Sequence, residues 1–400
     1  MTPARVRDDG PVLVFDPNHG GHRHEFIAWI ANAWIRESIQ RPLAIAAPDD
    51  TIHRSMSLRA RNPNAFTIHI STDPGLGDAS PRRQLATLEH LSATLGAHHA
   101  LAMDLEHLLH PGALTSRWSL QTLLSGITFR PTVHYSALGS PPDTIWDYAK
   151  RRGKALISGH ALRWHHVHTV FCLDETAVPA LARLAPPTRV VGLPDPVPPR
   201  PDGALSPTHA RAWAGVEPER HLALLAGRLD ARKNAVRVLE AARMLPEDAA
   251  KRLAVLLAGP VPKANRRQLD AAIQRVREQT PVAVHLIDGF VPDRHLTGLV
   301  DGADTVVLCY DRHVGSSGFL MRAADAGVPV LSQSFGLVGH LTRTHQLGLT
   351  VETMTPETIA EGLNQRITQP TLGYDAARAA AFVAGHSPEA FGRTIISHLV

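Results

Sequence analysis

The chain has 400 residues, of which 44% are hydrophobic and 20% are charged, and its net charge is +4 with histidine neutral. This composition is typical of a globular protein, and the length is comfortable for two domains. The charge is mild and scattered, which argues against a nucleic-acid-binding protein but suits an anionic small ligand. We find neither an apolar stretch of the roughly 20 residues that a membrane span needs nor the apolar core of a signal peptide. We therefore expect a cytoplasmic enzyme in which Cys172 and Cys309 are buried and reduced.

The first half of the chain alternates short apolar runs with helical patterns. Strands are expected at 11–16, 42–47, 66–71, 99–105, 126–135 and 167–174, and helices at 24–39, 81–95 and within 143–155. Such alternation is typical of a parallel sheet with helices on both faces.

A proline-rich segment interrupts this alternation. Residues 184–208 contain eight prolines, which extend neither a helix nor a central strand, so we interpret the segment as a stiff linker between domains. The alternation resumes afterwards, with strands expected at 221–227, 253–259, 282–289, 304–310 and 328–333, and helices at 235–245, 264–278, 293–300 and 318–326. The region from about 355 to 399 has an almost entirely helical pattern.

The segment 222–234, LALLAGRLDARKN, is the most informative part of the chain. An apolar strand ends at Gly227, Arg228 and Lys233 follow, and Asn234 stands at the expected N-cap of the next helix. Free amides and the helix dipole favour an anion at such a junction, and two cations suit a diphosphate. Taken alone, the pattern also fits an ordinary strand–helix junction with two surface cations.

A second small-residue loop strengthens the diphosphate interpretation. Gly315, Ser316, Ser317 and Gly318 follow the strand at 304–310 and precede a helix. Such a loop lets backbone amides approach a phosphate, and the hydroxyls donate as well. Both loops lie at the carboxyl edge of one parallel sheet, where ligands bind in open α/β sheets.

Three segments, GRLDARKN, VHLIDGFVPDRHLTGLVDGADTVVLCY and GSSGFLMRAADAGVPVLSQ, resemble the donor domain of GT-B glycosyltransferases, most closely the large retaining family four. The resemblance implies an α/β GT-B fold, with two Rossmann-like domains facing each other across a cleft. On this basis we expect an acceptor-binding domain at 1–195, a donor-binding domain at 196–380, and a helix at 381–400 that returns to the first domain.

The resemblance also implies roles for individual residues. Arg228 and Lys233 match the pair that grips the donor diphosphate, and both are expected to act in catalysis. The turn after the third strand of the domain contacts the nucleobase through its backbone, and the later loop holds the phosphates and the sugar. The implied donor-binding residues in these two places are Gly289, Phe290, Val291, His313, Val314, Gly315, Ser316, Ser317 and Gly318, together with Gly227.

One departure from the family concerns two glutamates eight positions apart. Their places are taken by Val314 and Arg322, and an arginine cannot accept hydrogen bonds from ribose hydroxyls. Sugar and ribose recognition is then expected from the 315–318 backbone, Ser316, Ser317 and His313. Arg322 is expected to reach a phosphate or to brace the loop, with a solvent-facing or structural role as the alternative. The departure indicates either a divergent enzyme or a non-catalytic relative.

The first domain offers fewer candidates. The loop at 17–26 resembles the Gly-rich turn after the first GT-B strand, which suggests donor contacts for Gly20 and Gly21 and an acceptor contact for His22. His134 matches a histidine that faces the donor sugar in the family, so it is a candidate catalytic residue. Asp104, at the end of the strand expected at 99–105, is a candidate for the acceptor side.

The expected function is that of a glycosyltransferase (EC 2.4, of the hexosyltransferase type). It would transfer a sugar from a nucleotide diphospho-sugar to an unidentified acceptor hydroxyl, with retention of configuration. The donor is a co-substrate, and no metal or cofactor is expected. The alternatives are a nucleotide-sugar epimerase or hydrolase on the same fold, and a relative that only binds the nucleotide sugar. Neither a nucleic acid partner nor a transmembrane segment is expected, while peripheral membrane contact is left open.

Overall fold

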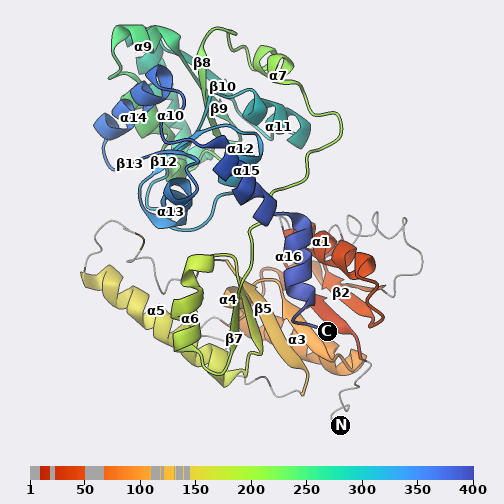
Figure 1. The fold of residues 1–400 in the computed structure, drawn as a ribbon. Helices are drawn as coiled ribbons and strands as arrows, with labels where there is room; N and C mark the ends of the chain where they lie inside the picture. Colours follow the sequence, from red (N-terminus) through yellow and green to blue (C-terminus); the bar gives the residue numbers. More distant parts are fainter. Residues whose placement is uncertain are drawn as a thin grey trace. The chain divides into compact units, whose positions relative to one another are not determined.

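The computed structural model describes residues 10–18, 23–49, 67–109, 118, 121–129, 131, 138 and 145–400. The chain divides into two compact units (Figure 1). Most of the described residues before Pro196, together with Ser387–Val400, form the first unit, and Pro196–His386 form the second. The return to the first unit thus begins at Ser387, six residues later than the expected start at residue 381, because the helix at Ala376–Gly385 belongs to the second unit.

The first unit contains a parallel sheet with the strand order β3-β2-β1-β4-β5-β6-β7. Its strands are β1 (Val12–Phe15), β2 (Leu43–Ala47), β3 (Thr67–Ser71), β4 (His99–Ala102), β5 (Leu123–Thr128), β6 (Thr169–Cys172) and β7 (Arg189–Gly192). The described helices are α1 (Arg23–Arg36), α3 (Pro81–Leu95), α4 (Leu105–Leu108), α5 (Ile145–Trp164), α6 (Val178–Leu184) and α16 (Pro388–Ile396). The strands are almost continuously apolar because helices cover both faces of the sheet.

Local sequence explains where the helix α3 begins and ends. Ser80 is its N-cap and accepts a hydrogen bond from the Arg83 amide, and Pro81 occupies the first helical position. Gly96 ends the helix in the left-handed conformation, with φ of 60°. Leu85 and Leu88 lie on the buried face.

The last helix, α16, packs against α1 within the first unit (Figure 1). The ring centroids of Phe391 and Phe26 are 4.8 Å apart. A Cβ atom at Gly392 would lie 2.5 Å from the Cβ of Ala33, so only glycine permits this approach of the two helices. The end of the chain therefore contributes to the core of the first unit.

The segment 184–208 is only partly the linker that the prolines suggest. Residues Arg189–Gly192 form the edge strand β7, which pairs in parallel with β6. An edge strand of four residues fits between flanking prolines because proline is excluded from central strands but not from the ends of edge strands. The linker interpretation therefore holds only after Gly192.

The second unit contains a parallel sheet with the strand order β10-β9-β8-β11-β12-β13. Its strands are β8 (His221–Ala226), β9 (Leu253–Ala258), β10 (Ala283–Ile287), β11 (Thr305–Leu308), β12 (Val330–Gln333) and β13 (Gly348–Val351). The helices are α7 (Pro207–Trp213), α8 (Ala235–Ala242), α9 (Glu247–Arg252), α10 (Lys263–Gln279), α11 (Asp293–Asp301), α12 (Gly318–Asp325), α13 (Gly336–Thr344), α14 (Pro356–Thr368) and α15 (Ala376–Gly385).

The core of the second unit lies on both faces of this sheet. Alternate residues of β8 face opposite layers: Leu222 and Leu224 pack with α11 and α12, whereas Ala223 and Leu225 pack with α8 and α10. The sheet is therefore covered on both sides and presents only its strand ends. Its carboxyl edge carries the loops that the sequence singled out.

The cysteines and the helices agree with two expectations from the sequence. Cys172 and Cys309 are free and buried, as expected. No helix among the described residues is long and apolar enough to cross a membrane.

His99 is a buried histidine in the first unit, and its Nε2 lies 2.7 Å from Ser125 Oγ. Burial, and after it the charge of the neighbouring His168, lowers the pKa of His99 to about 3.

Candidate functional site

Two glycines bring the loops of the second unit close together at the carboxyl edge of its sheet. Gly227, after β8, has φ of +94°, and Gly259, after β9, has φ of +142°. A Cβ atom at Gly259 would lie 2.1 Å from the Gly227 carbonyl oxygen. A Cβ atom at Gly227 would lie 2.9 Å from the Phe319 ring and 3.4 Å from Lys233 Nζ. Glycine at 259 therefore lets the backbones that follow β8 and β9 approach each other, and glycine at 227 lets Lys233 and Phe319 pack directly against the end of β8.

Lys233 is a buried cation at this edge, with only 4% of its surface exposed. It ends the short 3-10 helix Ala231–Lys233, and its Nζ donates a hydrogen bond of 3.0 Å to the Tyr310 hydroxyl. The Nζ also lies 4.6 Å from the centroid of the Tyr310 ring and 4.7 Å from that of Phe319. Both rings attract the ammonium through cation–π interactions. An ammonium has three N–H donors, so with one acceptor among the described residues Lys233 retains donors for a ligand.

Two arginines accompany Lys233. Arg228 is exposed, and its side chain makes no hydrogen bond or ion pair with the part of the chain that the structure describes. Arg232, which the sequence analysis did not single out, lies with its guanidinium carbon 5.6 Å from the Tyr310 ring centroid and pairs with Asp230 at 3.8 Å. Arg228 is therefore available to an anionic ligand, whereas Arg232 already has partners.

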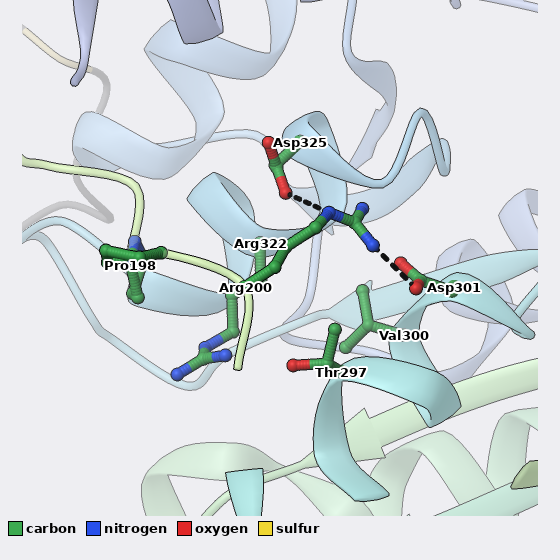
Figure 2. A pocket seen from close by; sticks show the side chains of 8 residues that line it. Pro198, Arg200, Thr297, Val300, Asp301, Arg322 and Asp325 are labelled. Atoms are coloured by element: carbon green, nitrogen blue, oxygen red, sulfur yellow. Dashed lines mark hydrogen bonds and ion pairs between the residues drawn. The ribbon is translucent and has the colours of Figure 1, made fainter. Parts of the chain in front are cut away.

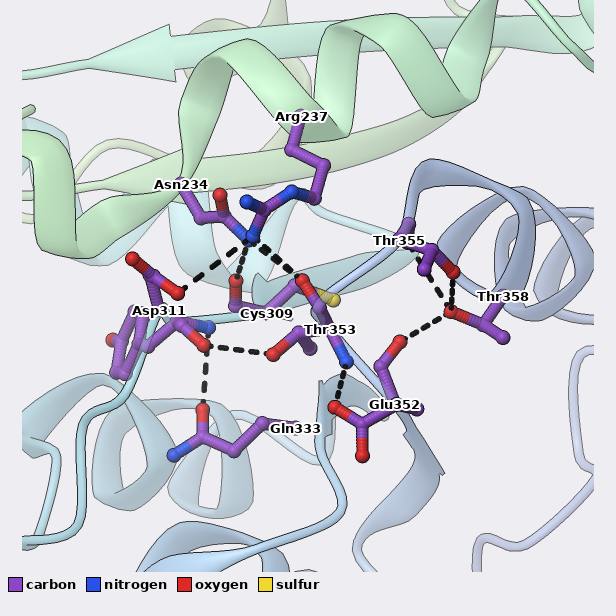
Figure 3. Close-up of polar contacts among 10 residues, drawn as sticks. Asn234, Arg237, Cys309, Asp311, Gln333, Glu352, Thr353, Thr355 and Thr358 are labelled. Atoms are coloured by element: carbon purple, nitrogen blue, oxygen red, sulfur yellow. Dashed lines mark hydrogen bonds and ion pairs between the residues drawn. The ribbon is translucent and has the colours of Figure 1, made fainter. Parts of the chain in front are cut away.

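The side chain of Asn234 bonds to backbone carbonyls that follow β11 and β13 and does not cap the helix α8. It stands at the N-cap of α8, as expected, but it has φ of +58° and its side chain makes no capping hydrogen bond. Instead, its Nδ2 donates to the carbonyls of Cys309 at 3.1 Å and Thr353 at 3.2 Å (Figure 3). Thr353 Oγ1 donates to the Tyr310 carbonyl at 2.9 Å, and Gln333 Oε1 accepts from the Tyr310 amide at 3.2 Å. This network fixes the backbone of Tyr310.

The loop between β11 and α12 is braced from several sides. The His313 carbonyl accepts a hydrogen bond of 2.7 Å from Gln333 Nε2, and the Val314 carbonyl accepts one of 2.9 Å from the Leu337 amide. His313 Nε2 lies 2.9 Å from the Ser316 carbonyl oxygen, so the imidazole of His313 holds the loop. These three hydrogen bonds brace the backbone of the loop at His313, Val314 and Ser316.

The first turn of α12 is open to a ligand. Ser317 is the N-cap, but its side chain does not bond to the helix amides. The amides of Gly318 and Phe319 have no acceptor among the described residues, and a Cβ atom at Gly318 would meet open space. Unpaired amides and the positive end of the helix dipole make this turn suitable for a phosphate. Because of the Gly227 packing, the turn is adjacent to Lys233.

The turn after β10 presents an exposed aromatic ring. Gly289 has φ of +138° with open space beside it, and Val291 is buried in the core. Phe290 between them has 86% of its surface exposed. An exposed ring in this position can stack on a planar base.

Arg322 points toward α11 instead of toward the first turn of α12. Its guanidinium lies 3.5 Å from Asp293 Oδ1, and the side chains of Arg322 and Asp293 are 13% and 60% exposed. Arg322 also lines a small pocket with Thr297, Val300 and the 198–200 segment (Figure 2). Arg200 crosses this pocket and pairs with Asp301 at 2.7 Å and Asp325 at 3.1 Å. Of the roles considered from the sequence, the structural one fits this setting best.

The candidates of the first unit are only partly described. Gly20, Gly21, His22 and His134 lie outside the described residues. The strand expected to carry His134 ends earlier than the sequence suggested, because β5 stops at Thr128 before Pro131. Asp104 caps the short helix α4, accepting a hydrogen bond of 3.1 Å from the His107 amide.

The chain is similar to a known protein family and to several solved structures. Residues 210–393 match the family model described as glycosyl transferases group 1. A sucrose-phosphate synthase from Thermosynechococcus elongatus superposes with a TM-score of 0.67 at 15% identity, covering 97% of this chain and 98% of that chain. HepE of Anabaena in complex with UDP gives a TM-score of 0.67 at 15% identity, with coverages of 98% and 99%.

WaaG, a glycosyltransferase involved in lipopolysaccharide biosynthesis, gives a TM-score of 0.62 at 15% identity, with coverages of 97% and 98%. No curated protein matches the sequence. Since the likeness to the solved structures extends over nearly the whole chain, it confirms the expected GT-B fold.

Proposed function

We propose that this chain, a glycosyltransferase of the GT-B fold, uses a nucleotide diphospho-sugar as its donor. Its residues 210–393 match the glycosyl transferases group 1 family model. The proposed reaction moves a hexosyl group to an acceptor hydroxyl, retains the anomeric configuration and uses no metal ion. The second unit binds the donor, and the acceptor binds to the first unit.

The observation that carries the proposal is the grouping of Lys233 with the open first turn of α12. A buried ammonium, the exposed guanidinium of Arg228 and the free amides of Gly318 and Phe319 all offer donors at one edge of the sheet. A diphosphate supplies acceptors and negative charge for all of them.

These groups also explain how the reaction is accelerated. As the bond between the anomeric carbon and the phosphate oxygen breaks, the electron pair stays on that oxygen and the diphosphate gains negative charge. Lys233, Arg228 and the α12 dipole stabilise this charge in the transition state. The acceptor oxygen forms the new bond to the anomeric carbon, and its proton passes to the departing phosphate.

We propose that the nucleoside part of the donor binds at the turn between β10 and α11 and at the start of α11. We place the base against the ring of Phe290, and the ribose hydroxyls within reach of the Asp293 carboxylate. Asp293 is exposed, whereas positions 314 and 322 carry no carboxylate. A carboxylate accepts hydrogen bonds from a diol, which an arginine cannot do.

A second candidate function is binding of the nucleotide sugar without catalysis. The observation that favours it is the absence of carboxylates at Val314 and Arg322. The two candidates differ in turnover and not in donor binding, so binding measurements alone do not separate them.

A two-step assay tests the proposal. A thermal-shift screen of UDP-, GDP- and ADP-sugars identifies the donor, since a ligand raises the stability of the state that it binds. The selected donor is then incubated with sugar acceptors, and products are followed by NMR, which also reports the anomeric configuration. Glycoside formation supports the proposal, release of free sugar indicates a hydrolase, and binding without either product indicates the non-catalytic relative.

A further inference from the structure

Tyr310 connects the buried lysine to the loop before α12. This residue follows β11 and is buried, and the sequence analysis assigned it no role. Its hydroxyl lies 3.0 Å from Lys233 Nζ and 2.9 Å from Ser317 Oγ. The three side chains thus form a continuous chain of hydrogen bonds from the strand end to the N-cap of α12.

The direction of these hydrogen bonds follows from the chemistry of Lys233. An ammonium only donates, so the Tyr310 oxygen accepts from Lys233. Either hydroxyl of the Tyr310–Ser317 pair can donate, but the buried Tyr310 hydroxyl has no other acceptor among the described residues, so donation to Ser317 Oγ is the arrangement that satisfies its hydrogen. Ser317 receives this hydrogen bond and keeps its own hydroxyl hydrogen for another acceptor. No other partner of Ser317 Oγ occurs among the described residues, so its hydroxyl hydrogen is available to a ligand.

The same arrangement keeps the first turn of α12 open. A serine at an N-cap ordinarily accepts from an amide of the first turn, which satisfies that amide internally. Here Ser317 makes no capping bond, and its Oγ lies 2.9 Å from the Tyr310 hydroxyl instead. The hydroxyl hydrogen of Ser317 and the amides of Gly318 and Phe319 therefore remain as donors at one helix end.

We propose that Tyr310 is a positioning residue for the donor diphosphate. Held by the Lys233 ammonium, its hydroxyl orients Ser317 as a hydrogen-bond donor to a phosphate oxygen and prevents Ser317 from capping α12. The inference rests on the proposed function, since it assigns the phosphate as the acceptor. The occupant is an anion with acceptor oxygens, because every group presented at this end of the helix is a donor.

The variant Tyr310→Phe separates this role from packing. It keeps the ring that contacts the Lys233 ammonium and removes only the hydroxyl. Ser317 is then free to turn back and cap α12. We expect the affinity for the nucleoside diphosphate to fall about fivefold to tenfold, while the affinity for the nucleoside stays close to that of the wild type. The melting temperature should fall, because the buried Lys233 ammonium loses its one acceptor among the described residues.

The experiment measures the affinities for UDP, GDP, ADP and the corresponding nucleosides by isothermal titration calorimetry. The proteins compared are the wild type and the variants Tyr310→Phe, Ser317→Ala, Ser317→Thr and Lys233→Met. Because Tyr310 acts through Ser317, the double variant Tyr310→Phe/Ser317→Ala should lose no more affinity than Ser317→Ala alone. Ser317→Thr keeps the hydroxyl and should retain most of the diphosphate affinity.

The outcomes distinguish this inference from the proposed function. If the wild type binds none of the nucleoside diphosphates, both are overturned. If Lys233→Met weakens diphosphate binding but Tyr310→Phe binds as the wild type does, only the role of Tyr310 is overturned. Equal weakening of nucleoside and diphosphate in Tyr310→Phe, or additive losses in the double variant, likewise contradict it.

Discussion

Replacing Lys233 by methionine tests the phosphate site with little disturbance of the fold. Methionine fills a similar volume and removes only the ammonium. A hydrogen bond to a charged group contributes about 1.5–3 kcal/mol. If Lys233 donates one such bond to the diphosphate, the affinity for the nucleoside diphosphate should fall about 10-fold to 150-fold.

The effect of Lys233→Met on stability should be small for a structural reason. The substitution removes one hydrogen bond and two ring contacts, but Tyr310 keeps Ser317 as a partner, so no buried hydroxyl is left unpaired. Removing a buried ammonium also removes its desolvation penalty. We therefore expect a change of about 1 kcal/mol or less, which is about 2–4 °C in melting temperature for a domain of this size.

Calorimetric titration measures both quantities against a matched control. Lys251→Met also removes one ammonium, but from α9, which precedes β9 and so lies at the opposite end of the strand from the phosphate site. We expect weak diphosphate binding by Lys233→Met, normal binding by Lys251→Met, and unchanged nucleoside binding by both. Equal losses in the two variants would show that only overall charge matters, and an unaffected Lys233→Met would refute the assignment of the lysine.

Three further predictions concern other parts of the chain. Phe290→Ala should weaken nucleoside binding by about 1–3 kcal/mol through lost stacking, measured by titration, while the melting temperature stays unchanged because the ring is exposed. Arg322→Glu should lower the melting temperature more than Arg322→Met does, since it places a second carboxylate beside Asp293; equal melting temperatures would contradict the ion pair. His99 has a folded pKa of about 3 against an ordinary 6.5, so its contribution to stability is complete above pH 6.5 and is lost as the pH falls toward 3. The unfolding free energy of the wild type should therefore fall relative to that of His99→Gln by about 1.4 kcal/mol for each pH unit between pH 6 and pH 4, as denaturant titrations can check; parallel pH curves would argue against a neutral buried His99.

The parts of the fold that follow from local pattern were predictable. Long amphipathic segments and apolar runs such as 221–227 and 253–259 identified most of the parallel strands of both units, but the strand β13 and the helix α13 were not predicted. The edge strand β7 was missed because its four residues lie among prolines, and pairing with β6 is a long-range effect that no local pattern records. The return of the last helix to the first unit was expected, but its start was placed before the end of α15.

The loops that form the candidate site were predictable from the sequence, but their side-chain contacts were not, and the binding of an anion there stays a prediction. The Gly turns and the two cations indicated an anion site because backbone geometry and charge follow from sequence. Tyr310 ends an apolar run and reads as a core residue, so its bond to Lys233 required the structure. The orientation of Arg322 toward Asp293 depends on how α11 packs against α12, which the sequence does not specify.

The central claim is that the second unit binds a nucleoside diphosphate at the carboxyl edge of its sheet. A crystal structure of the protein with the nucleoside diphosphate selected by titration tests this claim most directly. The account predicts phosphate oxygens within hydrogen-bond distance of Lys233 Nζ and of the Gly318 and Phe319 amides, with the base against Phe290. A diphosphate bound elsewhere, with these donors left in contact with solvent alone, would contradict it.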